Sequence, residues 1–233
     1  MEKVIYLIWR DPAVAAQDFA AGLHDALAPA LDAAGARSLK LNVADAQVAR
    51  AVGLKQVLLK PQPEALVQVW LDSAIAALRE AVDQAVAARG ARCAAYLVTE
   101  SQPVVNRKHP PRDGERTFGF AQVALLRKPA KLAYADWLEV WHNSHTTVAI
   151  ETQSTFEYIQ NVVIRPLTSD APAIDAIVEE CFPPEAMTDY KAFFDAPGDE
   201  AKFKANLNRM LQSVSRFVEP GSLDVIPTSQ YCF

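Results

Sequence analysis

The sequence predicts an α+β fold in which a β-α-β-β-α-β unit, the ferredoxin-like arrangement, occurs twice in tandem. The first observation is the order of the expected strands and helices, which is the same in both halves of the 233-residue chain. The second is a pair of short sequence matches that recur on corresponding elements. The third is residues 101–116, whose three prolines, one glycine and many charges are typical of a linker.

In the first half, β-rich runs predict strands, and apolar residues at three- and four-residue spacing predict helices. The expected strands are 4–10, 37–43, 64–71 and 92–99, and the expected helices are 13–34 and 74–89. Gly35 and Gly90 follow the two helices directly. Glycine is the residue that most often ends a helix, so both helix ends are well defined by the sequence.

The second half repeats this order. The expected strands are 117–127, 155–164, 173–182 and 223–232, and the expected helices are 132–152, 184–195 and 199–217. Pro227 falls inside the last strand and cannot donate a backbone hydrogen bond to a neighbour, which favours an edge strand or a bulge at this position. The predicted domains are therefore residues 1–104, a linker at 105–116, and residues 117–233.

Two sequence matches relate the halves. Asp18-Phe19 and Leu23-His24 correspond to Asp136-Trp137 and Trp141-His142, and residues 64–71 (EALVQVWL) correspond to residues 175–182 (DAIVEECF). A four-stranded sheet with helices on one face leaves its other face bare, and two such sheets can bury both bare faces against each other. We therefore expect each chain to close its own α+β barrel. Further pairing into a homodimer is compatible with the sequence.

Composition excludes several classes of function. The net charge is −5 without a basic block, so no nucleic-acid partner is expected. No apolar run approaches the length that spans a bilayer, and the N-terminus lacks the features of a signal peptide, so we expect a cytoplasmic protein without a membrane partner. The three cysteines and four histidines show no metal-type spacing, and no glycine-rich phosphate loop is present. We expect neither a metal nor a cofactor.

Four motifs in the second half resemble the EthD family of dimeric α+β barrels. They are Trp137, Trp141 and His145 on one helix, Tyr158-Ile159-Gln160-Asn161 on a strand, residues 175–182 on the next strand, and Asp199-Glu200 with Phe203 on the last helix. The resemblance covers residues 117–215, with Ala176 where glycine is usual and Cys181 where tryptophan is usual. It implies a ferredoxin-like barrel with an apolar pocket between helices and sheet, and it implies no particular reaction.

The first half resembles a divergent copy of the second. Leu27 stands in place of His145, and Gln68 stands in place of Glu179. The first half would keep the scaffold without this polar pair. The sequence therefore predicts one candidate site per chain, in the second half.

The candidate site centres on His145. Trp137, Trp141 and His145 share one stripe of the helix at 132–152, so the helix should turn them toward the sheet. The two tryptophans can be simple core residues or can also donate from their indole nitrogens to a ligand. His145 is either a hydrogen-bonded core histidine or a general acid or base, and the family motif raises the second possibility.

Strand residues supply the remaining candidates. Glu179 and Glu180 are adjacent in a strand and must face opposite sides, so one carboxylate could orient His145 or instead form an ion pair; we assign that role to Glu179. Tyr158 could donate a proton or stabilise an oxyanion, and Gln160 shares its strand face. Phe156 and Tyr231 complete the predicted substrate-binding set of Trp137, Trp141, Gln160, Phe156 and Tyr231.

These residues predict a cofactor-independent enzyme that moves a proton on a small, apolar carbonyl or phenolic metabolite. His145 would act as acid or base with Tyr158 or Glu179, giving isomerisation, cyclisation or dehydration, so a lyase or isomerase is favoured over an oxidoreductase. Two alternatives stay open. The chain could bind a metabolite without chemistry, or it could be a cofactor-free monooxygenase.

Overall fold

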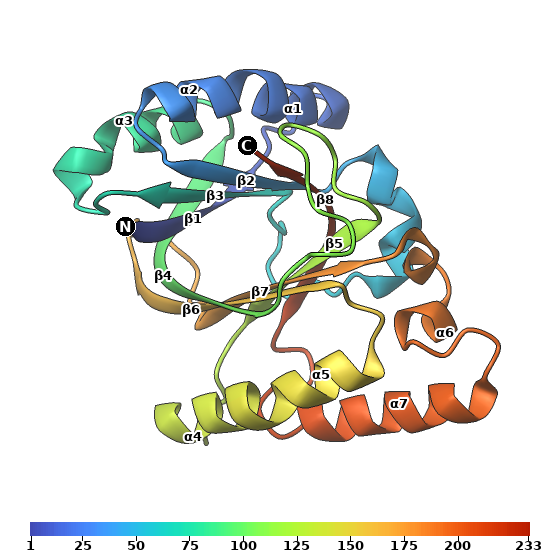
Figure 1. Cartoon of the computed structure of the whole chain (residues 1–233). Helices are drawn as coiled ribbons and strands as arrows, with labels where there is room; N and C mark the ends of the chain where they lie inside the picture. Colours follow the sequence, from blue (N-terminus) through green and yellow to red (C-terminus); the bar gives the residue numbers. More distant parts are fainter.

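The computed structural model describes all 233 residues and contains a closed, eight-stranded antiparallel barrel with helices outside it (Figure 1). The strands in chain order are β1 (Glu2–Trp9), β2 (Ser38–Val43), β3 (Ala65–Leu71), β4 (Arg92–Val104), β5 (Phe120–Leu126), β6 (Glu157–Pro166), β7 (Ala176–Phe182) and β8 (Asp224–Cys232). Around the barrel they follow the order β1-β3-β2-β8-β5-β7-β6-β4. The fold is therefore mixed α+β, as the sequence predicts.

Each half of the chain supplies four neighbouring strands. The first half gives the order β4-β1-β3-β2 and the second gives β8-β5-β7-β6. The barrel closes at two junctions between the halves, where β2 pairs with β8 and β4 pairs with β6. A closed sheet leaves no strand edge exposed to another chain, so the two halves complete each other within one molecule.

Helices cover the outer face of the barrel on two sides. The first half supplies α1 (Ala16–Gly22), η1 (Leu23–Leu27), α2 (Ala28–Ala33), η2 (Ala46–Leu54) and α3 (Ala76–Ala87). The second half supplies α4 (Tyr134–Leu138), η3 (Glu139–His145), α5 (Thr146–Thr152), η4 (Pro184–Met187), α6 (Tyr190–Phe193) and α7 (Glu200–Val214). In Figure 1, α1 to α3 lie on one side of the barrel and α4, α5 and α7 on the opposite side.

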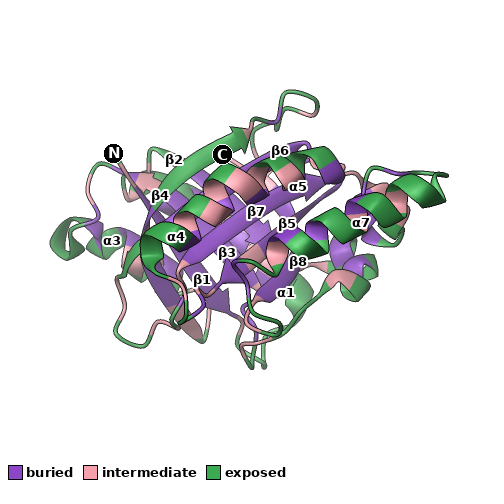
Figure 2. Ribbon diagram, turned by 90° about the horizontal axis from the view of Figure 1, so that it is seen from below, coloured by how far each residue is buried: buried purple, intermediate pink, exposed green.

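The apolar core has three layers. One cluster packs α1, η1, α2 and α3 against the outer face of the first sheet, and a second packs α4, η3, α5 and α7 against the second sheet. A third cluster, which includes Ile5, Leu66 and Val123, fills part of the barrel interior. Figure 2 looks onto α4, α5 and α7 and shows largely buried strands behind helices whose outward faces are exposed.

The long first helix of each half contains a π-helical turn in the same place. Residues Leu23–Leu27 form this turn in the first half and Glu139–His145 form it in the second. In the second, the Thr146 backbone N–H donates to the Trp141 carbonyl oxygen. A π-turn adds a residue to the helical repeat and is often found at functional sites, and here it ends at His145.

Every strand expected from the sequence is present, with three differences in detail. β4 continues to Val104, beyond the expected end of the strand at residue 99 and up to the predicted linker at 105–116. The turn at Ala46–Leu54 was not expected, because its nine residues carry no regular strand or helix pattern. The region 184–195 forms two short turns, η4 and α6, instead of one helix, because Thr188 and Asp189 between them have non-helical backbone angles.

Pro227 also occupies a different setting from the one predicted. β8 is an interior strand that pairs with both β2 and β5, although an edge was expected. Pro227 pairs with Gln122 on β5, while β2 pairs only with residues from Ser229 onward. At Pro227, β8 has no hydrogen-bonding partner on β2. No backbone hydrogen bond to β2 is lost through the missing N–H, so the barrel can accommodate a proline at this position.

Candidate functional site

A cavity of about 330 Å³ lies between the outer face of the second sheet and the helices that cover it. Sixteen of its 22 lining residues are hydrophobic. They include Trp141, Phe193, Phe194, Met210 and Phe217. Small-molecule sites are typically apolar cavities of roughly 300–1,000 Å³ with a few placed polar groups, so this cavity is the candidate site.

The polar wall of the cavity is a row of three cross-strand neighbours. Glu180 on β7 lies opposite Gln122 on β5 and opposite Tyr158 on β6. All three line the cavity. Because neighbouring strands are roughly 4.8 Å apart, Glu180 is flanked on both sides by a group that can form hydrogen bonds.

Glu180 is the residue of this wall whose buried side chain lacks a protein partner. Its side chain has no hydrogen-bond partner in the protein, and its Oε1 atom is sealed from solvent. Burial raises the pKa of Glu180 to about 7. A carboxyl group with a pKa near neutrality can both take up and release a proton at working pH, which is the property of a general acid–base group.

The buried side-chain amide of Gln160 holds Tyr158 in place. Gln160 Nε2 donates to the Tyr158 hydroxyl oxygen at 2.9 Å and to Thr146 Oγ1 at 2.8 Å. Thr146 Oγ1 in turn donates to the Trp141 carbonyl oxygen at 3.1 Å. Burial and the nearby Glu180 charge raise the pKa of Tyr158. The phenol therefore stays protonated, and its own O–H remains available as a donor.

His145 lines the same cavity from the helix side, at the end of the π-turn. Its Nδ1 lies 3.0 Å from Ser213 Oγ on α7, and its ring packs against Phe217. Burial, with a smaller contribution from Arg216, lowers the pKa of His145 to about 4. The imidazole is therefore neutral near pH 7 and is a weaker base than Glu180.

The other predicted binding residues divide between this cavity and other places. Trp141 lines the cavity, whereas Trp137 Nε1 donates to the Phe217 carbonyl oxygen at 3.1 Å and belongs to the helix core. Phe156 lies in an outer groove instead. Tyr231 packs against His24 on the first half, far from the lining of the cavity.

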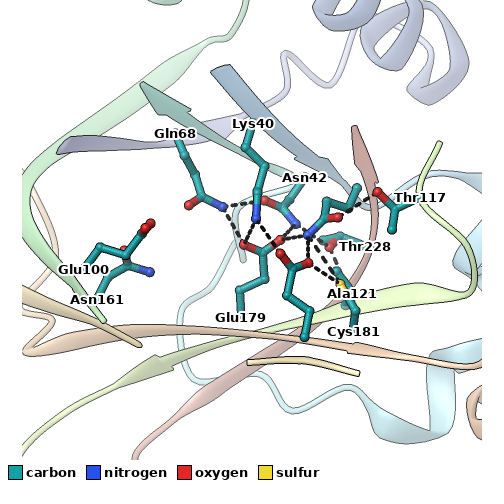
Figure 3. A network of polar contacts seen from close by, with 12 residues as sticks. Lys40, Asn42, Gln68, Glu100, Thr117, Ala121, Asn161, Glu179, Cys181 and Thr228 are labelled. Carbon is teal, nitrogen blue, oxygen red and sulfur yellow. Dashed lines mark hydrogen bonds and ion pairs between the residues drawn. The ribbon is translucent and has the colours of Figure 1, made fainter. Parts of the chain in front are cut away.

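Glu179 does not accompany His145, and this part of the predicted site is wrong. Glu179 points into the barrel, where its carboxylate accepts hydrogen bonds from Asn42, Gln68 and Gln230 and pairs with Lys40 at 3.4 Å (Figure 3). Burial alone would raise the pKa of Glu179, but the Lys40 charge and the amide donors lower it overall. Strand alternation places the neighbouring Glu180 on the opposite face, toward His145.

Two residues of the polar wall were not chosen from the sequence. Strand alternation shows only that Glu179 and Glu180 face opposite sides of the sheet. The strand register is needed to tell which of the two carboxylates faces the cavity. Gln122 is not among the residues predicted from the sequence. The available signal is the difference between the halves, because the corresponding residue in the first half is a valine. In the first sheet the row is Val4, Val69 and Leu39, and in the second it is Gln122, Glu180 and Tyr158.

No group of three or more His, Cys, Asp or Glu side chains is placed to hold a metal ion. None of the helices has both the length and the apolar character that a membrane crossing requires.

One solved structure supports the fold. No protein-family model and no curated protein matches the sequence. A solved structure described as an anthrone oxidase-like protein is similar with a TM-score of 0.56 and 10% identity, covering 99% of this chain and 92% of that one. Chlorite dismutase from Candidatus Nitrospira defluvii aligns with a TM-score of 0.41 and 10% identity, over 98% and 90% of the two chains. The closed barrel and the first of these similarities place the chain in the dimeric α+β barrel class of folds.

Proposed function

We propose that this protein is a cofactor-independent enzyme that moves a proton on a small, apolar molecule bearing a carbonyl or phenol group. The observation that carries the proposal is Glu180, a buried carboxyl group without a protein partner in the wall of an otherwise apolar cavity. An unpaired buried carboxyl destabilises a fold. Such a cost is common in active sites, where a group is held ready for a ligand.

The residues of the cavity divide the chemistry between them. The Glu180 carboxylate removes a proton from the carbon next to a ligand carbonyl, and the electron pair of that C–H bond forms the C=C bond of an enolate. The Tyr158 hydroxyl donates a hydrogen bond to the oxygen that gains charge. Glu180, now protonated, returns the proton. Return to the same carbon gives exchange, and return to the oxygen or to another carbon of a conjugated enolate completes an isomerisation. His145 is neutral and serves as a hydrogen-bonding group in the wall.

The same proposal includes the finer assignments made from the sequence. The two halves would be ferredoxin-like repeats, supported by their equal strand orders and by the π-turn in each first helix. The second half would be EthD-like, supported by the meeting of Trp141, His145 and Tyr158 at one cavity. The protein would act in the cytoplasm on a small-molecule partner, as a self-closed barrel that can also pair into a homodimer.

The test measures hydrogen–deuterium exchange at the acidic carbon of rigid apolar ketones. Anthrone, indanone and tetralone are incubated in deuterated buffer without oxygen. Proton NMR follows the loss of the acidic methylene signal, which lies next to the carbonyl in indanone and tetralone and across the central ring from it in anthrone. We expect the protein to accelerate exchange of at least one ketone, and Glu180→Gln to reduce the acceleration by about 10²–10⁴-fold. Glu219→Gln, at an exposed carboxylate that lines neither the cavity nor the outer groove, is the matched control and should keep the rate.

The outcomes separate the candidate functions. If no ketone exchanges faster than in buffer, or if Glu180→Gln keeps the full rate, the proposed chemistry is wrong. Tight binding without exchange would instead identify a binding protein. Product that forms only after oxygen is admitted, with oxygen consumed, would identify a cofactor-free monooxygenase.

A further inference from the structure

Gln153 lies where the candidate cavity meets a second space. It directly follows α5, and its backbone N–H donates to the Ala149 carbonyl oxygen at 3.1 Å. Gln153 lines both the cavity and an outer groove of about 830 Å³. The groove runs between residues 104–109, Phe118 and the segment around Pro183. A ligand that fills the cavity would therefore meet the Gln153 amide at the edge that faces the groove.

The Gln153 amide is unusual among the buried glutamines because it forms no hydrogen bond with the protein. The residue is only 9% exposed, and its Oε1 atom is sealed from solvent without a partner. Gln62, which is 8% exposed, donates to the Gln56 carbonyl oxygen at 2.7 Å and to Asp224 at 2.8 Å. Gln160 and Gln230 also donate to neighbouring side chains.

We propose that Gln153 is a specificity-determining residue that binds a hydroxyl group of the ligand, in addition to the group that faces Glu180. A hydroxyl both donates and accepts, so it can pair with either end of an amide. The ligand would be an aromatic or similarly apolar molecule with two oxygen functions. The inference takes the cavity to be the ligand site, as the proposed function does, but it does not require that the ligand reacts.

The groove beyond Gln153 supports an aromatic ligand with a polar outer edge. His109 stacks on Phe118 with ring centroids 4.0 Å apart, and Phe156 meets His109 edge-on at 4.9 Å. Asn106 holds the chain around His109 through two hydrogen bonds. These rings give the groove an aromatic patch, whereas Arg107, Lys108, Glu185 and Asp195 make much of the rest polar. The amide therefore lies between an apolar cavity and a groove that can solvate the polar edge of a ligand.

Binding measurements test this assignment directly. Isothermal titration calorimetry compares the naphthols, which carry one hydroxyl, with the isomeric dihydroxynaphthalenes, in wild type and in Gln153→Leu. We expect at least one dihydroxynaphthalene to bind wild type about three- to tenfold more tightly than the naphthols, the gain of one net hydrogen bond. The gain should disappear in Gln153→Leu, while naphthol affinity changes little. Competition between naphthol and dihydroxynaphthalene shows that both occupy one site.

Thermal unfolding separates a ligand-binding role from a structural one. Gln153→Leu removes a buried amide without a partner, so its Tm should be equal to or higher than that of wild type. Gln62→Leu is the matched control: it breaks two hydrogen bonds, should lower Tm by about 2 °C or more, and should keep the preference for two hydroxyls.

Three results would overturn the assignment. They are the absence of binding by every naphthol, equal affinity for one and two hydroxyls in wild type, and a preference that survives Gln153→Leu. A loss of Tm in Gln153→Leu as large as that in Gln62→Leu would identify a structural amide instead. Failure of the ketone exchange assay with these binding results intact would reject the proposed chemistry and leave the Gln153 site standing.

Discussion

The two outer faces of the barrel share a backbone and differ in their chemistry. Each sheet presents a row of three cross-strand neighbours to the helix that covers it. These are Val4, Val69 and Leu39 in the first half, and Gln122, Glu180 and Tyr158 in the second. The first face packs into an apolar core, and only Leu39 of its row also reaches a mostly polar groove beside α2. The second face borders an apolar cavity of about 330 Å³.

The helices differ in the same way. In the first half, the π-turn carries Leu23 and Leu27, which are both buried in the apolar cluster. In the second half, the turn carries Trp141 and His145. Since the first face shows that apolar residues satisfy this backbone, the polar residues of the second face are not needed to hold the fold. These polar residues lower the stability of the fold, and residues kept at such a cost are typical of a functional site.

We expect the largest loss of activity when the three residues of the second row are replaced by their counterparts in the first row. The variant that combines Gln122→Val, Glu180→Val and Tyr158→Leu should lose ketone exchange by more than about 10²-fold, because both the acid–base group and the oxyanion donor are removed. Its Tm should stay close to that of wild type, because the removal of a buried unpaired carboxyl offsets the lost Gln160–Tyr158 hydrogen bond and the lost side-chain volume. Exchange rates by NMR and thermal unfolding by circular dichroism measure the two quantities. Retained exchange, or a collapsed Tm, would show that the two faces are not equivalent scaffolds.

The adjacent carboxylates Glu179 and Glu180 should respond oppositely to the same substitution. Glu179→Gln leaves Lys40 with one carboxylate partner, Glu157 at 3.3 Å, and disrupts a buried network. We expect it to lower the free energy of unfolding by about 4 kcal/mol. Glu180→Gln should raise this free energy at pH 8, where the wild-type carboxyl is ionised and unpaired.

Urea denaturation of the two single variants beside wild type measures these changes. Equal signs for both substitutions would contradict the separation of the inner, structural carboxylate from the outer, functional one.

Titration of Glu180 should make both stability and activity depend on pH. The folded pKa of about 7 lies above the ordinary value of 4.5, so folding favours the protonated form. The contribution of Glu180 to the free energy of unfolding is therefore complete below pH 4.5. It is lost as the pH rises to about 7, a change of about 3 kcal/mol. Exchange activity should rise around pH 7, where the carboxyl of the folded protein becomes the carboxylate base.

His145 changes the free energy of unfolding in the opposite direction with pH, because its pKa is lowered in the folded protein. Its stabilising contribution is complete above pH 6.5 and is lost as the pH falls toward about 4. The difference between wild type and Glu180→Gln cancels the His145 contribution, since both proteins contain the histidine. Urea denaturation at several pH values gives this difference. A difference that does not change between pH 4.5 and 7 would mean that Glu180 is not perturbed as proposed.

Periodicity predicted the mixed α+β fold because the helices carry an apolar stripe and the strands, which are buried on both faces, are almost continuously apolar. The runs at 64–71 and 173–182 became β3 and β7. The turn at Ala46–Leu54 could not be predicted, since it is held by packing against the second half and by contacts such as Tyr190 to the Gly53 carbonyl oxygen. That turn supplies Gly53 and Leu54 to the cavity, so one wall of the site comes from a contact between distant segments.

The candidate site was predictable on the helix and ambiguous on the sheet. Helical spacing was enough to direct Trp141 and His145 to the same side. For Glu179 and Glu180, alternation fixes only that they face opposite sides, and the choice depends on which face is the barrel interior. Gln122 had no signal of its own, because its importance follows from its position opposite Glu180.

The smallest effect is expected at His145, the residue that the sequence favoured as the acid or base. His145→Leu installs the residue of the first half, Leu27, at the end of the π-turn. With a pKa of about 4, the imidazole is neutral and removes no proton from a ligand at pH 7. We therefore expect exchange to fall by about tenfold or less, the loss of one hydrogen-bonding group, with an unchanged dependence on pH around 7. NMR exchange rates from pH 5 to 9 measure both features. A loss as large as that in Glu180→Gln, together with a pH profile that no longer rises near 7, would move the base from Glu180 to His145 and restore the reading from the sequence.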